Sequence, residues 1–469
     1  MRRRDFLRMA GAVSVGLTGS VTGATARRPN VVYILTDDLG YAELGCYGQK
    51  KIRTPNIDRL AAEGMRFTQH YSGNPVCAPS RCTLMTGYHT GHAQVRGNRQ
   101  VGGKEGWVLG ATIGGQWPLS EDTFTVGHLF QRAGYATGAF GKWGLGRVGT
   151  TGDPQRQGFD HFFGYICQRQ AHTFYPRHLW KDGEIVRISG NEYGQQKSYS
   201  HDLIADEALK FIRANKDRPF FLYVPFTIPH VALQVPEDSL AEYRGRWPDP
   251  PYDGSKGYVA HENPRACYAG MVTRMDKDVG RIMALLDELG LDDNTLVIFS
   301  SDNGPTFAGG ADSEFFESAG PLRGLKASVY EGGIRVPFIA RWPGRIRAGS
   351  ESDHVSAFWD FLPTCAELLG QNPPAGIDGI SMLPTLLERP GQKEHEHLYW
   401  ELRGQQAVRM GDWKAVRLKP DRKIQLYNLR TDPGEQNDVA DRNPEVLTRI
   451  ERILTEGRTD SDVFPLQRG

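Results

Sequence analysis

The sequence predicts an α/β protein with a large, mostly parallel sheet flanked by helices and a smaller C-terminal antiparallel sheet subdomain. Two observations support this prediction. Apolar runs rich in β-branched and aromatic residues alternate with segments whose apolar residues recur at helical spacing, and helices between strands imply right-handed crossovers between parallel strands. From about residue 394 the apolar segments shorten and are separated by turn residues, which is the pattern of an antiparallel meander.

The elements of the large sheet follow in order along the chain. Residues 30–36 (NVVYILT) form an apolar run between Pro29 and Asp37, as expected for a buried parallel strand. The further predicted elements are helices at 55–64, 123–133, 202–214 and 266–289 and strands at 135–140, 219–226, 295–301 and 334–340. Residues 150–197 and 236–264 show little periodicity, so we expect loops that decorate the sheet and shape a substrate mouth.

The C-terminal part is predicted to contain four short strands and a helix. The strands are expected at 397–401, 406–410, 413–417 and 425–429, and the helix at 444–455. We place a domain boundary within 375–395. The predicted organisation is a leader of residues 1–26, a catalytic α/β domain of residues 27–385 and an α+β subdomain of residues 386–469.

Composition excludes several classes of protein. Among 469 residues, 56 Lys and Arg balance 55 Asp and Glu, which argues against a nucleic-acid binder that works by bulk charge. The hydrophobic share of 39% and the charged share of 24% are those of a globular protein. Six cysteines in this length do not make a disulfide scaffold.

The N-terminus has the features of an export signal. Arg3-Arg4-Asp5-Phe6-Leu7 resembles the twin-arginine motif, a weakly apolar stretch follows over 9–21, and Ala24-Thr25-Ala26 is a candidate cleavage site. The apolar stretch is too short and too rich in Gly, Ser and Thr to span a bilayer stably, and no later segment approaches about 18 continuous apolar residues. We therefore expect export by the twin-arginine machinery, to a bacterial periplasm or the medium, with no stable membrane span.

Two oxygen-rich pairs directly follow predicted strands. Asp37-Asp38 come after 30–36, and Asp302-Asn303 come after 295–301. In open α/β sheets, ligands bind outside the carboxyl ends of the strands, and carboxylate and amide oxygens are what Ca²⁺ or Mg²⁺ prefers. Either pair alone could be a helix N-cap or an Asx turn. The two together predict a site for one hard cation.

Residues 77–87 (CAPSRCTLMTG) combine cysteines with a helix start. Pro79 favours a first-turn helical position, so Cys77 is expected at or just before a helix N-terminus, where oriented N–H groups suit an anion. The alternative is a structural or redox pair of Cys77 and Cys82.

Cys77-x-Pro79-Ser80-Arg81 with Thr86-Gly87 resembles the signature of the type I sulfatases, within the alkaline-phosphatase-like superfamily. In that family a maturation enzyme oxidises the cysteine to formylglycine. The resemblance covers nearly all of the mature chain, and its further matches are Asp37-Asp38, Gly141-Lys142-Trp143, Pro229-His230, Asp302-Asn303-Gly304, Lys326 with Tyr330-Glu331-Gly332-Gly333, and Leu426-Tyr427-Asn428-Leu429 with Asp432-Pro433. The fold that it implies agrees with the fold predicted above.

The resemblance also implies a role for each matched residue. The ligands of one divalent cation, Ca²⁺ in preference to Mg²⁺, would be Asp37, Asp38, Asp302, Asn303 and the hydrated form of the modified Cys77. Arg81 would brace the formylglycine and the metal site. Sulfate binding and departure of the leaving oxygen would fall to Lys142, His230 and Lys326.

One departure from the family pattern concerns Gly144. Many members have Lys-Trp-His where this chain has Lys142-Trp143-Gly144, and that histidine commonly contacts the formylglycine. Another group or water must take its place, or turnover is slow. His89 and His92 are weak candidates, and each is more simply explained as an ordinary loop or packing histidine.

The predicted function is hydrolysis of sulfate monoesters by a sulfuric ester hydrolase. Three implied carboxylates carry three negative charges, whereas the divalent cation and three basic side chains carry five positive ones, so the pocket favours an anion. This net charge also fits a phosphate ester. A formylglycine gem-diol favours sulfate, because one hydroxyl attacks sulfur and the other then allows collapse to the aldehyde, which expels sulfate without a second attack by water. The alternatives are a phosphonate or phosphate ester hydrolase of the same superfamily, and a non-catalytic protein that binds sulfated glycans.

The substrate is expected to be a carbohydrate sulfate rather than a small aryl or alkyl sulfate. The segments 150–200 and 236–264 are rich in aromatic and basic side chains, which suit sulfated sugars but also serve as ordinary loop anchors. These side chains include His161, His172, Tyr175, Arg177, His178, Trp180 and Trp247.

Overall fold

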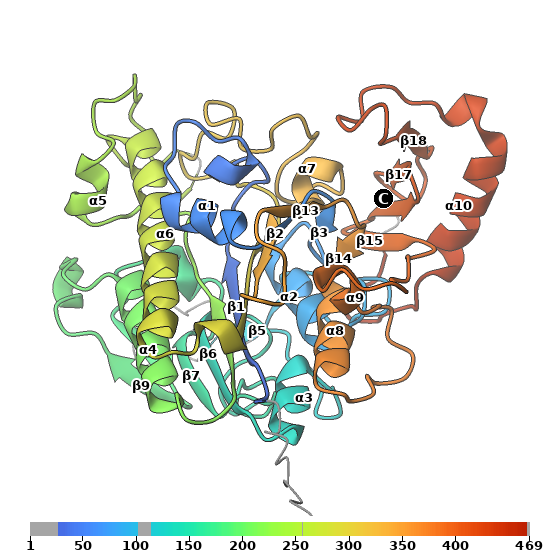
Figure 1. Cartoon of the computed structure of the whole chain (residues 1–469). Coiled ribbons are helices and arrows are strands. Elements are labelled where there is room, and N and C mark those ends of the chain that lie inside the picture. Colours follow the sequence, from blue (N-terminus) through green and yellow to red (C-terminus); the bar gives the residue numbers. More distant parts are fainter. Residues whose placement is uncertain (1–26, 102–113, 256, 467–469) are drawn as a thin grey trace, which may run out of the picture.

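The computed structural model describes residues 27–101, 114–255 and 257–466. The predicted leader, residues 1–26, lies outside this part of the chain. Figure 1 shows a large sheet wrapped by helices and, beside it, a smaller C-terminal sheet, and the two sheets have ten and four strands. The predicted fold class is therefore confirmed.

The centre of the large sheet is parallel. The strand order is β13-β2-β12-β11-β1-β10-β6-β7-β8-β9. The parallel centre consists of β11 (Thr295–Ser301), β1 (Asn30–Thr36), β10 (Phe220–Pro225), β6 (Ala136–Lys142) and β7 (His161–Tyr165). Antiparallel pairings appear towards both edges, which are built from β12 (Phe338–Arg341), β2 (Met65–Phe67), β13 (Ser350–Ser352), β8 (His178–Lys181) and β9 (Glu184–Arg187). The outermost strand β13 pairs with β2 in parallel.

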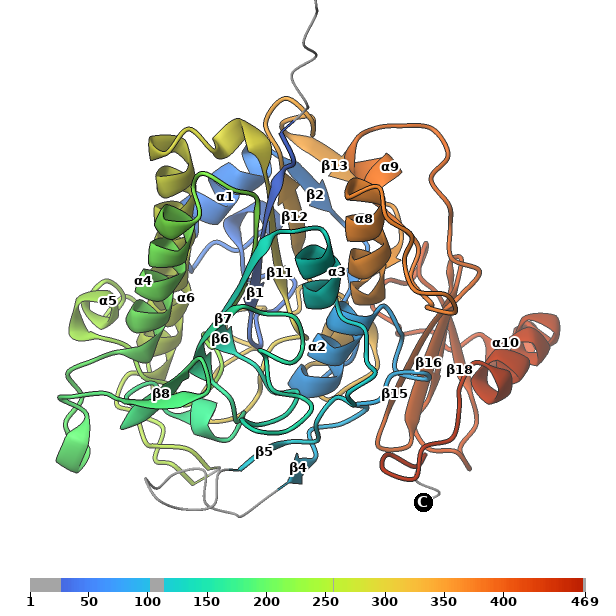
Figure 2. The same cartoon turned by 90° about the horizontal axis from the view of Figure 1, so that it is seen from below.

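Helices cover both faces of this sheet, as Figure 2 shows. One face packs against α1 (Pro55–Ala62), α4 (Ser200–Ala214) and α6 (Pro264–Glu288). The other face packs against α2 (Cys77–Thr86), α3 (Val126–Arg132) and α8 (Phe361–Leu368). Every residue of β1 is buried, which explains why its sequence is continuously apolar rather than alternating.

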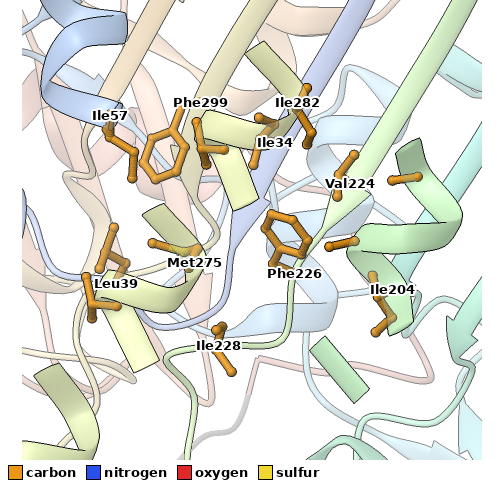
Figure 3. Close-up of a cluster of buried hydrophobic side chains, with 14 of the residues drawn as sticks. Ile34, Leu39, Ile57, Ile204, Val224, Phe226, Ile228, Met275, Ile282 and Phe299 are labelled. Atoms are coloured by element: carbon orange, nitrogen blue, oxygen red, sulfur yellow. The ribbon is translucent and has the colours of Figure 1, made fainter. Parts of the chain in front are cut away.

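Successive side chains of a strand serve the two cores in turn. Ile34 belongs to the first core and Tyr33 to the second. Figure 3 shows the first core, in which Ile34, Val224 and Phe299 from three adjacent strands meet Met275 and Ile282 of α6. Burial of each such side chain contributes roughly 1.5–3 kcal/mol, so these layers fix the positions of the strand ends.

The C-terminal sheet is an antiparallel meander, as predicted. It comprises β15 (Leu398–Leu402), β16 (Gln405–Met410), β17 (Trp413–Arg417) and β18 (Gln425–Asn428), and α10 (Pro444–Glu456) packs on its outer face. Its inner face packs against the large domain through Trp400, Tyr71 and Trp359.

Some predicted elements were wrong. The segment 150–197, expected to be loop, contributes β7, β8 and β9 to the large sheet, and 236–264 contains the short helix α5 (Glu237–Ala241). The hairpin β8–β9 turns at Asp182-Gly183, where both residues have positive φ, as an Asp-Gly type I′ turn requires. The strand expected at 334–340 begins only at Phe338, because Ile334 ends the short helix α7 (Glu331–Ile334).

The helices of the fold belong to its globular cores. Within the described ranges, no helix is both long and apolar enough to cross a bilayer.

Candidate active site

The two oxygen-rich pairs meet at one edge of the large sheet. Asp37 and Asp38 follow β1, and Asp302 and Asn303 follow β11, the parallel neighbour of β1. The backbone N–H of Asp38 donates to Asp302 Oδ1 at 3.2 Å, and Asn303 Nδ2 donates to Asp38 Oδ1 at 2.7 Å. All four side chains are fully buried. The parallel pairing of β1 and β11 is what brings these oxygens together.

Cys77 begins α2 and faces the first of these pairs. Its thiol donates to Asp37 Oδ1 across 3.5 Å. Burial, followed by the charge of Asp37, raises the pKa of Cys77 to about 12. Because a thiolate rather than a thiol is the nucleophile, this unmodified side chain, which stays protonated at neutral pH, is a poor nucleophile. Cys77 and Cys82 are both free thiols, so this structure contains no disulfide between them.

Arg81, one turn along α2, joins the two acidic pairs. Its Nε and Nη2 donate to Asp302 Oδ2 at 3.1 and 2.8 Å, and Nη2 lies 3.6 Å from Asp37 Oδ2. Nη1 donates to the carbonyl oxygen of Lys142 at 2.5 Å. The guanidinium is fully buried, and it ties α2 to the ends of β1, β6 and β11.

Two lysines complete the charged cluster. Lys142, the last residue of β6, places Nζ 2.5 Å from Asp37 Oδ2. Lys326 places Nζ 2.7 Å from the carboxylate of Asp38. Each lysine therefore neutralises one member of the first acidic pair.

His230 approaches the same cluster from the segment after β10. Its Nε2 lies 3.5 Å from Asp38 Oδ2, and its Nδ1–H donates to the carbonyl oxygen of Val231. Burial, and then the positive charge of Lys326, lowers the pKa of His230 well below its usual value. The imidazole is therefore neutral and turns an unprotonated Nε2 towards the site.

The electrostatics of the cluster fit a bound cation. Burial and then the charge of Asp37 raise the pKa of Asp302 to about 7, and burial also raises the pKa of Asp38. The pKa of Asp37 is lowered, because Lys142 and the other cations outweigh the effect of its burial. Ligand atoms of Asp37, Asp38, Cys77 and His230 all lie within 4.8 Å of one another, so the cluster could hold a metal ion.

Asn303 gives a second indication of a cation. Its side-chain oxygen Oδ1 is buried and has no hydrogen-bond partner in the described part of the chain, while its Nδ2 is fully used. A buried acceptor without a partner is costly, and an amide oxygen beside carboxylates is a ligand that hard cations use. The donor set therefore fits Ca²⁺ or Mg²⁺.

Two further rings, those of His172 and Tyr258, lie near His230 because segments distant in the sequence pack together. His172, at the end of a 3₁₀ turn (Gln170–His172), stacks on His230 with ring centres 5.0 Å apart, and Tyr258 lies 5.3 Å from His172. His172 was among the aromatic and basic residues of the predicted loops, whereas Tyr258 was missed because nothing in its irregular segment signals it. Trp247 instead packs against Tyr243 and Phe315.

His89 and His92 belong to a different cluster. His92 Nδ1 lies 2.9 Å from Asp378 Oδ1, and the His89 ring stacks on the His92 ring. His89 Nδ1 accepts a hydrogen bond from the N–H of Gly91. Among the described contacts, none links either histidine to Cys77, so this pair is explained as packing.

The sequence matches two family models. Residues 29–371 match the sulfatase model, and residues 325–459 match the model described as N-sulphoglucosamine sulphohydrolase, C-terminal.

Individual proteins are similar over nearly the whole chain. The chain is 31% identical to an N-acetylgalactosamine-6-O-sulfatase of Bacteroides thetaiotaomicron, covering 93% of this chain and 94% of the relative. It is 33% identical to human arylsulfatase A, covering 94% and 90%. The crystal structure of Ps i-CgsB in complex with k-i-k-neocarrahexaose superposes with a TM-score of 0.76 at 30% identity, covering 92% and 93%. The chain therefore belongs to the type I sulfatases of the alkaline-phosphatase-like superfamily, and it is a sulfuric ester hydrolase.

Proposed function

We propose that the protein hydrolyses sulfate monoesters of carbohydrates with a formylglycine formed from Cys77. The observation that supports this most directly is the place of Cys77, at the N-terminus of α2 and 3.5 Å from Asp37. The thiol itself has a raised pKa, so the side chain needs conversion before it can act. When present, the hydrated formylglycine would supply the oxygen nucleophile that attacks sulfur.

We infer that one divalent cation is held by Asp37, Asp38, Asp302, Asn303 and the matured residue 77. The cation would stabilise negative charge that develops on the substrate oxygens. Ca²⁺ is favoured over Mg²⁺, because Ca²⁺ accepts an almost complete shell of protein oxygens whereas Mg²⁺ retains several waters, and these four side chains are fully buried.

The basic side chains of the site would bind the anionic substrate. Lys142 and Lys326 each contact one carboxylate of the first acidic pair, so both ammonium groups lie beside the nucleophile. They would bind sulfate oxygens and stabilise the departing oxygen. His230 would line the sulfate pocket, and Arg81 would keep Asp302 and residue 77 in register.

A sugar sulfate is the proposed substrate class. His172 and Tyr258 form an aromatic rim beside His230, and aromatic faces with polar tips suit sugar rings. The relative from Bacteroides thetaiotaomicron is named for N-acetylgalactosamine and the structural neighbour was solved with an oligosaccharide, which supports this choice.

The proposal is tested by comparing Cys77→Ala with Cys82→Ala. Both cysteines are buried in α2, but only Cys77 faces the acidic pair. Peptide mass spectrometry of active protein should show an aldehyde at residue 77. Turnover of nitrophenyl sulfate and of sulfated sugars should vanish in Cys77→Ala and persist in Cys82→Ala. Activity with an unmodified thiol, or faster turnover of an aryl phosphonate than of any sulfate, would overturn the proposal.

We also propose that the precursor leaves the cytoplasm through the twin-arginine machinery, with the periplasm or medium as destination. The support is the Arg3-Arg4 motif with the cleavage candidate at 24–26. Replacing Arg3 and Arg4 by Lys should leave the precursor in the cytoplasm, whereas replacing Arg27 and Arg28 by Lys should not. Unchanged export of the first variant, measured by cell fractionation, would exclude this route.

A further inference from the structure

Gln168 occupies the space above Gly144. The strands β6 and β7 continue as neighbours beyond their ends, because the N–H of Trp143 donates to the carbonyl oxygen of Tyr165 at 2.9 Å and that of Gly144 to Ile166 at 3.3 Å. A Cβ added at Gly144 would lie 3.1 Å from Gln168 Cγ and 3.3 Å from its Cδ. Gly144 also has φ +80°, a conformation that side chains disfavour. The carboxamide of Gln168 therefore stands where a side chain at position 144 would project.

Hydrogen bonds connect Gln168 through Asn98 to Ala78, the residue that follows Cys77. Gln168 Nε2 donates to Asn98 Oδ1 at 3.3 Å, and the same oxygen accepts the backbone N–H of Ala78 at 3.0 Å. Ala78 follows Cys77 in the first turn of α2. The backbone N–H of Gln168 donates to Gln116 Oε1 at 2.9 Å. Gln168 is thus held at its backbone N–H and at its carboxamide, and the carboxamide is linked to the start of α2.

The side-chain oxygen of Gln168, Oε1, is a buried acceptor. Gln168 is only 5% exposed, and its Oε1 has no hydrogen-bond partner among the described residues. A buried acceptor of this kind costs about 1–3 kcal/mol when it stays unpaired. A fold that retains such an acceptor in a side chain linked through Asn98 to the first turn of α2 is expected to supply a donor there.

We propose that Gln168 Oε1 accepts a hydrogen bond from a hydroxyl of the matured residue 77 and thereby orients the nucleophile. The inference rests on the proposed function, because that hydroxyl exists only after maturation. A carboxamide has no ionisable proton in the neutral pH range, so Gln168 is a positioning residue and not a base. No side chain is then required at position 144.

The test compares Gln168→Ala with Gln170→Ala in matured enzyme. Gln170 is equally buried, but its Nε2 donates to the carbonyl oxygen of His178 in β8 rather than to Asn98. Gln168→Ala should lower kcat by about tenfold or more for nitrophenyl sulfate and for a sugar sulfate alike, with KM within about twofold. Gln170→Ala should keep the wild-type kcat even if its Tm falls equally.

A second readout does not depend on turnover. Hydroxylamine captures the aldehyde form of residue 77 and not its hydrate, so the rate of oxime formation reports the hydration equilibrium. Loss of a hydrogen bond to the hydrate should favour the aldehyde and raise that rate about fivefold in Gln168→Ala, as expected for about 1 kcal/mol. Gln170→Ala should be labelled at the wild-type rate.

Gly144→Ala displaces Gln168 without altering it. Its Cβ would press on Gln168 Cγ at 3.1 Å, so kcat should fall in the same direction as in Gln168→Ala.

Three results would overturn the inference: wild-type kcat in Gln168→Ala, a loss confined to sugar sulfates, or an unchanged labelling rate. Failure of the proposed function would look different, because the wild-type enzyme would then be inactive towards sulfates or would carry no aldehyde.

Discussion

Arg81 donates two hydrogen bonds to a single oxygen of Asp302, and neither side chain reaches solvent. The carboxylate of Asp302 also lies close to that of Asp37, which is paired with Lys142. Removing one member of such a buried pair leaves an uncompensated charge. The pair therefore links the stability of the domain to the integrity of the site.

Arg81→Ala should lower the free energy of unfolding by about 3–5 kcal/mol, measured by urea denaturation of the metal-loaded protein. Arg81→Lys should recover only part of that loss, because an ammonium group cannot replace the guanidinium fork. Arg213, whose ion pair with Glu288 is exposed, is the control, and Arg213→Ala should cost far less than Arg81→Ala because solvent screens an exposed pair. An equally small loss in Arg81→Ala would contradict the bracing role.

Asn303→Ala should weaken Ca²⁺ binding by at least about tenfold, since even indirect partners of a metal typically matter that much. The reason is the unpartnered Oδ1 of Asn303 beside two carboxylates. Calorimetric titration of chelator-treated protein with CaCl₂ gives the affinity. Asn191, also buried but with Nδ2 bound to the carbonyl oxygens of Pro176 and Ser198, is a matched control. A normal affinity in Asn303→Ala would remove this residue from the ligand set.

The convergence of the acidic pairs could be predicted because the signals for it are local in the sequence. The runs 30–36 and 295–301 are continuously apolar and each is followed at once by its acidic pair, so the rule about carboxyl ends of parallel strands applied directly. The helix start at Cys77 was likewise signalled by Pro79.

The sequence did not predict strands β7, β8 and β9 at one edge of the large sheet. β9 is an edge strand with Glu184 and Ile185 exposed, so it lacks the hydrophobic alternation that marks a half-buried strand. Its one local signal was Asp182-Gly183 at the turn. The stacking of His172 on His230 and the position of Gln168 over Gly144 depend on how β6, β7 and the segment after β10 pack together, which no local pattern encodes.

The His395–Asp360 contact should make stability depend on pH. His395 Nε2 lies 2.8 Å from Asp360 Oδ1, which also accepts the N–H of Ile380. Although burial lowers the pKa of His395, the charge of Asp360 outweighs it, and the net pKa is raised. The resulting stabilisation is fully present below the unfolded value of about 6.5 and is lost as the pH rises through the higher folded pKa.

His395→Gln should therefore reduce the free energy of unfolding more at pH 5.5 than at pH 9, as measured by urea denaturation. His161, which is exposed beside Asp182, provides a control for the substitution itself, and His161→Gln should cost little stability because exposed pairs contribute little. A penalty for His395→Gln that is independent of pH would show that the contact is an uncharged hydrogen bond.

His230→Ala should slow nitrophenyl sulfate and sugar sulfates by similar factors. Nδ1–H donates to the carbonyl oxygen of Val231, and the pKa of His230 is well below its usual value because of burial and Lys326, so Nε2 has no proton to give to a leaving oxygen. General acid catalysis would be worth about 10²–10⁴-fold for a poor leaving group and far less for nitrophenol. Steady-state kinetics on both substrates measure the ratio. His201→Ala, which removes a buried histidine paired with Asp278, controls for loss of packing and should leave kcat near wild type. A loss in His230→Ala that is a hundredfold larger on the sugar sulfate would instead assign the proton donor to this residue.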